Sequence, residues 1–303
     1  MSETKNVYVF GKSRTDGNAN MRNTLGGKGA NLAEMTSLGI PVPPGFTIPC
    51  ELCNYYYDNH KSLPKNIEND IADAIKLMEE QSGAVFGSID NPLLVSVRSG
   101  ARISMPGMMD TVLNLGLNDQ AVKGLAINTG NARMAYDSYR RFITMYAEVV
   151  KGLSPKLFEH AWSELKGWAR VAKDTDLNAD NLKLACGIFK DIYFKELGIP
   201  FPQSPQVQLM DAIKAVFESW NTERAFLYRA VEHIPNEWGT AVNVQAMVFG
   251  NRGNNSATGV AFTRNPASGE NKYYGEYLVN AQGEDVVAGI LTPLPISAEN
   301  AAE

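Results

Sequence analysis

Residues 25–39, LGGKGANLAEMTSLG, decide the fold because this stretch changes character along its length. Its glycines suit a tight turn, and the residues after them follow a helical pattern that ends at a glycine. Leu32, Met35 and Leu38 fall on one face of that helix. The β-type run NVYVF, residues 6–10, comes before it. The sequence therefore predicts a strand, a glycine turn and a helix in this order.

The rest of the chain mixes strands with helices. Residues 42–48, 93–100, 239–250 and 257–266 have strand composition. Between about residue 119 and residue 203 the pattern is helical throughout, as in residues 132–150 and 178–197. This predicts an α+β chain (α/β, multi-lobed) with a helical insert.

Composition narrows the class of protein. Of the 303 residues, 44% are hydrophobic and 20% are charged, with a net charge of −5. A mildly acidic chain without a basic block is a poor match for nucleic acid or a membrane surface, so neither is expected as a partner. No secretory signal and no long apolar run stand out. With three cysteines, the composition favours a reducing, cytoplasmic setting.

Cys50 and Cys53 form a C-x-x-C pair after a strand-like run, where Pro49 opens a predicted helix. A redox motif needs a thiolate at a helix N-terminus, and a zinc site needs a second ligand pair. The alternative is two small residues near a helix start, and we favour it.

The glycine turn GGKG at residues 26–29 is the first candidate site. Glycines let a backbone approach phosphate closely, and Lys28 adds a mobile positive charge beside Gly27. The pattern is neither a P-loop nor a dinucleotide-binding fingerprint. A solvated lysine on a glycine turn is the alternative.

Arg98 is the second candidate, because it emerges from the apolar run VSVRSG. Its planar fork suits phosphate oxygens, whereas the alternative is a structural ion pair. The methionine-rich loop that follows could fold over phosphates or serve only core packing. Its candidate residues are Gly107, Met108, Met109, Asp110 and Thr111.

Two later segments complete the set of candidates. In VNVQAMVFGN, a strand with Gln245, Met247 and Val248 could hold an adenine ring, or be an ordinary strand. In GEYLVNAQGEDVVAG, carboxylates cluster at Glu276, Glu284 and Asp285. They could hold Mg²⁺, balance basic residues, or form a solvated acidic loop.

Taken together, these segments resemble the pyruvate, phosphate dikinase family. The matching runs are GGKGANL, NPLLVSVRSGA, SMPGMMDTVLNLG, NVQAMVFGN, GVAFTRNPASGE and YGEYLVNAQGEDVVAG, followed by TPLPI. They occur in the family's order and at similar spacing, from about Val7 to about Ile296. The related water dikinases have a methionine-poor loop after a VRSSA motif, and read GLGE where this chain reads AQGED.

The resemblance implies an ATP-grasp nucleotide-binding fold with a helical insert, incomplete at its C-terminal side. It divides the chain into residues 1–118, the first part of an N-terminal lobe; 119–203, the insert; 204–248, the return to that lobe and a hinge; and 249–303, the start of a C-terminal lobe. The family converts ATP, phosphate and pyruvate to AMP, pyrophosphate and phosphoenolpyruvate. It uses Mg²⁺ and passes the β-phosphoryl group through a histidine on a separate domain.

Residue by residue, the resemblance implies that Lys28 and Arg98 are the catalytic cations of the phosphate site. Gly27, Gly107, Met108, Met109, Asp110 and Thr111 would lie near the phosphates, and Gln245, Met247 and Val248 near the adenine. Arg141 would be a further basic residue near the site. Glu276, Glu284 and Asp285 would serve the metal or phosphate end.

The sequence departs from the family pattern in three respects. His60, His160 and His233 lack the Gly-Gly-Met-Thr-Ser-His context of the phosphate carrier. The pyruvate-binding barrel is not recognised, nor is the family's acidic pair with its Leu-Gln-Thr-Arg strand. We therefore expect a fragment that is inactive alone and depends on the phosphohistidine and pyruvate-binding domains. A separate regulatory module and part of a water dikinase are the alternatives.

Overall fold

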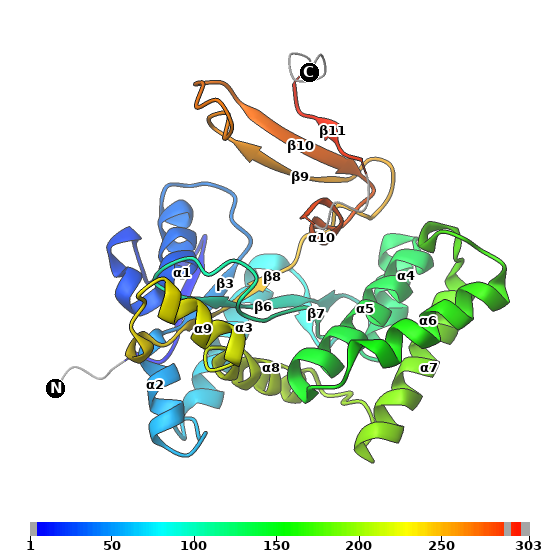
Figure 1. The fold of residues 1–303 in the computed structure, drawn as a ribbon, viewed down its shortest axis with the longest axis horizontal. Coiled ribbons are helices and arrows are strands. Elements are labelled where there is room, and N and C mark those ends of the chain that lie inside the picture. The colour runs from blue at the N-terminus through cyan, green and yellow to red at the C-terminus, as the bar shows by residue number, and fades with distance from the viewer. Residues whose placement is uncertain (1–4, 288–291, 298–303) are drawn as a thin grey trace.

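The computed structural model describes residues 5–287 and 292–297. At its centre, six of the described strands form an antiparallel sheet in the order β2-β1-β3-β8-β6-β7 (Figure 1). The strands are β1 (Tyr8–Gly11), β2 (Arg14–Thr15), β3 (Gly45–Ile48), β6 (Val95–Gly100), β7 (Thr111–Leu115) and β8 (Ala241–Ala246). Together with the helices around this sheet, they confirm the mixed α and β class.

The two faces of the central sheet differ in chemistry. Val97 lies opposite Val244 on one face, and Arg98 lies opposite Asn243 on the other, because side chains alternate along a strand. The apolar face belongs to the main hydrophobic core, together with three helices. These are α2 (Cys50–Asp58), α3 (Ile67–Ser82) and α8 (Pro205–Ser219). The polar face carries Arg98 and Asn243.

Helix α1 (Arg22–Ser37) lies against the polar face of the sheet. Gly29 makes this close approach possible, because a Cβ there would lie 2.8 Å from Thr47 and 2.9 Å from Asn243. The helix is kinked at Gly26, whose φ is 67°. The predicted turn and helix are therefore both present, although the helix begins before the glycines.

The face of α1 that packs inward is made of small residues. Leu25, Gly26, Gly29, Ala30 and Ala33 are buried. Leu32 and Met35 are only partly buried, and Leu38 is 70% exposed. The large apolar residues that mark a helix in the sequence thus do not form its buried face, because the short distance to the sheet leaves no room for them.

Between β7 and α8, every element of the described chain is a helix. These elements are α4 (Ala121–Thr129), α5 (Ala132–Lys151), α6 (Pro155–Ala169), η2 (Asp174–Asp176) and α7 (Ala179–Leu197). The helical character predicted for this region is confirmed. Helix α5 also packs against β7 and α8, and its apolar side chains share one core with the sheet. The division of the chain into four parts stays a prediction.

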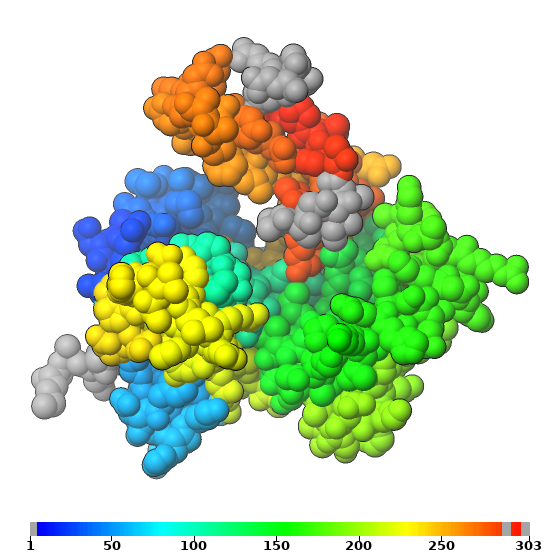
Figure 2. All heavy atoms as spheres, viewed as in Figure 1, coloured from blue at the N-terminus to red at the C-terminus, as the bar shows by residue number. Residues whose placement is uncertain are grey.

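A smaller antiparallel sheet follows β8. It contains β9 (Ala257–Phe262), β10 (Tyr274–Val279) and β11 (Leu294–Pro295), with the short helix α10 (Gly283–Val287) beside it. This sheet stands above the main body in the view of Figure 1, with α10 between the two, and Figure 2 shows the same view with all heavy atoms. The remaining elements are β4 (Val85–Phe86), β5 (Pro92–Leu93), α9 (Glu223–Val231), η1 (Ala19–Met21) and η3 (Asn236–Trp238).

Burial argues against a redox role for the C-x-x-C pair. Cys50 and Cys53 are buried, and burial raises their pKa to about 11 and about 12, the opposite of a reactive thiolate. Within residues 5–287 and 292–297, no helix has the length and apolar character needed to cross a bilayer.

Candidate functional site

A cavity of about 650 Å³ lies between the start of α1 and the segment that joins β6 to β7. Five of the predicted site residues line it: Gly27, Lys28, Gly107, Met109 and Thr111. Three basic side chains face this space, from Arg22, Lys28 and Arg102, and none of the described residues that line it is acidic. The cavity is therefore suited to an anion, and we call it the cation cavity after the basic side chains that line it.

Lys28 projects from the start of α1 toward the end of β6. Its ammonium donates a hydrogen bond to the carbonyl oxygen of Ser99 at 2.9 Å. The side chain is exposed to the cavity, yet the surrounding protein atoms lower the pKa of Lys28, and the charge of Arg98 lowers it further. The backbone N–H of Gly27 donates to the carbonyl of Ala101 at 2.9 Å, which joins the glycine turn to the loop after β6.

Arg98 lies on the polar face of the sheet, opposite Thr111 on one side and Asn243 on the other. One terminal nitrogen of its guanidinium donates to the side-chain oxygen of Gln245. Its Nε is buried and has no hydrogen-bond partner among the described residues. Burial lowers the pKa of Arg98, and no carboxylate in the described ranges counters this effect. The structural ion pair considered for Arg98 is thus not formed there.

The methionine-rich loop is held by an arginine from a distant helix. Arg224 of α9 donates from Nε to the carbonyl of Met108 at 3.2 Å, and its guanidinium also pairs with Asp110. Burial raises the pKa of Asp110, and Arg224 partly offsets this. Met108 and Met109 pack against the core. Gly107, by contrast, has a φ of 71°, and a Cβ added to it would meet no atom within 4 Å.

Gln245 and Met247 connect the cation site to the proposed hinge. The Gln245 amide accepts from Arg98 and donates to the carbonyl of Pro43 at 3.1 Å. Met247 donates its N–H to the carbonyl of Leu94 at 2.9 Å. Met247 and Val248 line a different cavity, of about 450 Å³, and Val248 is 77% exposed. The lining of the cavity at the start of α1 therefore includes neither these residues nor Arg98.

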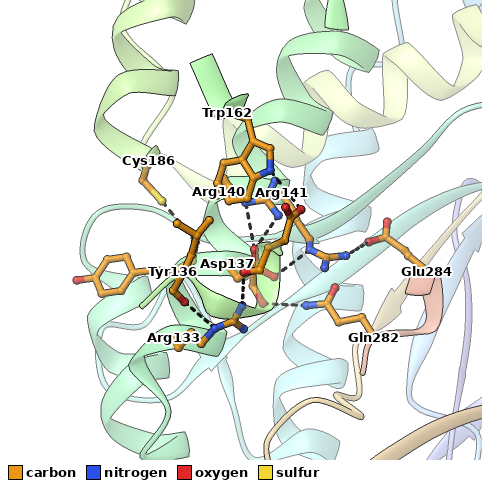
Figure 3. Close-up of polar contacts among 12 residues, drawn as sticks. Arg133, Tyr136, Asp137, Arg140, Arg141, Trp162, Cys186, Gln282 and Glu284 are labelled. Atoms are coloured by element: carbon orange, nitrogen blue, oxygen red, sulfur yellow. Dashed lines mark hydrogen bonds and ion pairs between the residues drawn. The ribbon is translucent and has the colours of Figure 1, made fainter. Parts of the chain in front are cut away.

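Arg141 lies in a charged cluster that joins α5 to α10 (Figure 3). Its Nε donates to Asp137 at 3.0 Å, and its Nη1 donates to Asp285 at 3.0 Å and to Glu284 at 3.4 Å. Arg140 donates to the other Asp137 oxygen at 2.7 Å. Burial would raise the pKa of Asp137, but the two arginines outweigh it and hold that pKa below its usual range.

A second contact strengthens the same junction. The Gln282 amide donates to the hydroxyl of Ser138 at 3.1 Å, and the Gln282 N–H donates to Asp285 at 2.8 Å. Burial raises the pKa of Glu284, although Arg141 opposes this. The acidic pair thus balances a basic residue, one of the alternatives weighed from the sequence.

The described residues contain no group of three or more His, Cys, Asp or Glu side chains that could hold a metal ion. Glu284 and Asp285 face Arg141, and Glu276 lies on β10 opposite Pro295. These three carboxylates do not form an assembled Mg²⁺ site here, and their metal role stays a prediction.

Four residues of these arrangements were missed from the sequence: Arg22, Arg102, Asp137 and Arg224. Arg22 and Arg102 flank motifs already singled out, so their charge beside those motifs is a signal that sequence reasoning could have used. Asp137 and Arg224 act through contacts with distant segments, for which the sequence carries no local signal.

Comparison with known proteins decides the family. Residues 22–62 and 59–301 match the family described as pyruvate phosphate dikinase, AMP/ATP-binding domain. The chain belongs to this family. It is 59% identical to pyruvate, phosphate dikinase of Clostridium symbiosum over 292 residues, which cover 96% of this chain. It is 56% identical to that of Rhizobium meliloti (strain 1021) over 291 residues and 53% identical to the chloroplastic pyruvate, phosphate dikinase 1 of Zea mays over 294, covering 96% and 97% of this chain.

The chain spans about a third of the length of these dikinases: 33% of the Clostridium symbiosum protein, 32% of the Rhizobium meliloti protein and 31% of the Zea mays protein.

Proposed function

We propose that this chain binds ATP with the triphosphate in the cavity between α1 and the loop from β6 to β7. The observation that carries this proposal is a concave site with basic side chains from Arg22, Lys28 and Arg102 and no acidic side chain among its described lining. A buried cation without a carboxylate partner is costly unless an anion completes the site, and the buried Nε of Arg98 has this setting.

The residues take distinct roles in this proposal. Lys28 and Arg98 neutralise the charge that grows on the phosphates during transfer, a task that depends on prearranged cations. The loop at Gly107 covers the phosphates, with Thr111 at its base. The adenine lies by the hinge, near Gln245 and Met247, where backbone groups can hydrogen-bond to its edge and apolar side chains can pack against its ring.

We also propose that the whole protein is a cytoplasmic pyruvate, phosphate dikinase. In that protein this region passes the β-phosphoryl group of ATP to a histidine on another domain, and pyruvate receives it on a third. The names of its relatives support this over a water dikinase. The two activities differ in their need for inorganic phosphate, so a full-length enzyme that turns over without phosphate would contradict the assignment.

Mg²⁺ is proposed only as an ion that enters with ATP. Because Mg²⁺ is commonly bound by one or two carboxylates plus substrate phosphates, a complete protein site is not required. Glu276, Glu284 and Asp285 remain the predicted carboxylates. If they serve the metal, Glu276→Gln should weaken Mg-ATP binding while leaving metal-free ATP binding unchanged.

Calorimetry on this chain tests the proposal directly. We expect ATP with Mg²⁺ to bind at millimolar concentration or tighter, and Lys28→Ala and Arg98→Ala each to weaken binding about 10-fold or more. Lys123→Ala, at an exposed lysine on α4, is the control and should bind as the unmodified chain does. A folded chain that shows no heat of binding with ATP would refute nucleotide binding by this region alone.

A further inference from the structure

Arg102 has a setting unlike that of a surface arginine. It lines the cation cavity, and its guanidinium lies over the ring of Trp238, 5.2 Å from the ring centroid. Its Nε is buried without a hydrogen-bond partner among the described residues. Of the described carboxylates, none forms an ion pair with it, in contrast to the arginines of the α5 cluster. The side chain is thus held in place by Trp238 and by the thiol of Cys50, and no ion pair with a described carboxylate balances its charge.

The position of Arg102 along the chain places it at one end of the cavity. Strand β6 begins near the hinge, where Leu94 accepts a hydrogen bond from Met247, and then passes Arg98. Lys28 meets the same strand at Ser99. Arg102 follows in the bend after the end of β6, four residues after Arg98. The order along this segment is therefore the hinge contact at Leu94, then Arg98, then the Lys28 contact at Ser99, and last Arg102.

We propose that Arg102 binds a phosphate dianion at the end of the cavity farthest from the hinge, and that Trp238 is a positioning residue that orients it. This inference rests on the proposed binding of ATP, because the hinge then holds the adenine and the outermost phosphate reaches Arg102. The dianion is either the terminal phosphate of ATP or a free orthophosphate beside a shorter nucleotide. Both present the same oxygens to a planar guanidinium.

A purely structural role is the competing explanation, since stacking on Trp238 also stabilises the fold by itself. The two roles differ in what a substitution changes. A structural arginine affects the melting temperature and leaves the ranking of ligands unchanged. An arginine that binds phosphate changes the preference for ATP over AMP.

The test is calorimetry of the full 303-residue chain with ATP, ADP, AMP and orthophosphate as separate probes. Arg102→Gln is compared with Arg170→Gln, an exposed arginine at the end of α6, and thermal melting is recorded for each. We expect Arg102→Gln to weaken ATP binding about 10- to 100-fold and AMP binding by less than about twofold. Trp238→Leu should weaken ATP binding to a smaller extent, with AMP again unaffected. It also serves as the second variant if Arg102→Gln does not fold.

The probes separate the sources of the dianion. A selective loss of ATP affinity identifies the terminal phosphate, whereas loss of orthophosphate binding in the presence of AMP, with ATP unchanged, identifies the free ion. Equal weakening of ATP and AMP, or no weakening of any probe, overturns the inference while leaving the proposed function in place. Failure of the unmodified chain to bind either nucleotide overturns both.

Discussion

At the scale of single residues, the surroundings of Arg98 support the proposed anion site. An arginine on a buried strand is ordinarily matched by a carboxylate, as Arg141 is matched by Asp137, Glu284 and Asp285. Arg98 instead has a neutral amide partner in Gln245. Because a neutral partner offsets little of the cost of burying charge, the site is electrostatically incomplete in a way that triphosphate oxygens can satisfy.

The buried thiols give a prediction about pH. Burial raises the pKa of Cys53 from 9.0 to about 12 in the folded chain, while the unfolded chain keeps the lower value. The folded state therefore holds its proton more tightly, so stability is fully present below about pH 9 and declines as pH rises toward 12. Between about pH 9 and pH 12, we expect the free energy of unfolding of Cys53→Ala to fall by about 1.4 kcal/mol less per pH unit than that of the unmodified chain. Denaturant unfolding at pH 7 and pH 10 measures it, and identical losses in both proteins would contradict the assignment.

At the scale of elements, the start of α1 depends on Gly26. The φ angle of Gly26 is 67°, in the left-handed region that favours glycine. In addition, a Cβ at this position would lie 1.6 Å from the carbonyl oxygen of Gly100. Gly107 has a similar φ of 71° but nothing within 4 Å. We expect Gly26→Ala to destabilise the chain by about 2–5 kcal/mol and Gly107→Ala by about 1 kcal/mol. Chemical denaturation of the two variants distinguishes backbone strain from a clash, and equal effects would disprove the role of packing.

The same elements show how far sequence reasoning reaches. Helix α5 and strand β6 were predictable, because their apolar periodicity reflects local geometry. The buried face of α1 was not, since Leu32, Met35 and Leu38 dominate its pattern while Gly29 and Ala33 make the contacts. The short distance between a helix and a sheet is a tertiary property that hydrophobicity does not encode.

The site follows the same division. Lys28, Gly107 and Thr111 were predictable from their motifs, and the structure brings them to one cavity. The pairing of Arg224 with Asp110 and of Asp137 with Arg141 was not, because each partner lies on an element chosen by the fold. Motifs identify the residues that face a ligand, whereas the residues that hold them in place emerge only from packing.

At the scale of the whole molecule, the cluster around Asp137 connects the main body to the segment beside the C-terminal sheet. Helix α5 contributes Asp137, Ser138 and Arg141, and α10 with the residue before it contributes the partners (Figure 3). These contacts are partly or wholly buried, so salt screens them less than it screens surface pairs. These contacts therefore help to fix α10, and with it the segment beside the C-terminal sheet, against the main body.

Removing Arg141 should loosen that junction selectively. Arg141→Gln leaves Asp137 of α5 facing Glu284 and Asp285 of α10 without the cation that lies between them, and the resulting like-charge repulsion favours separation of α10 from α5. We expect amide hydrogen exchange in β9, β10 and α10 to become about 10-fold faster, while β6 and β8 stay unchanged. Lys166→Gln, which breaks the exposed pair with Asp174, is the matched control and should change neither region. Faster exchange throughout the central sheet would instead mean that Arg141 supports the core. The contact between α5 and α10 would then not be a separate point of movement between the two sheets.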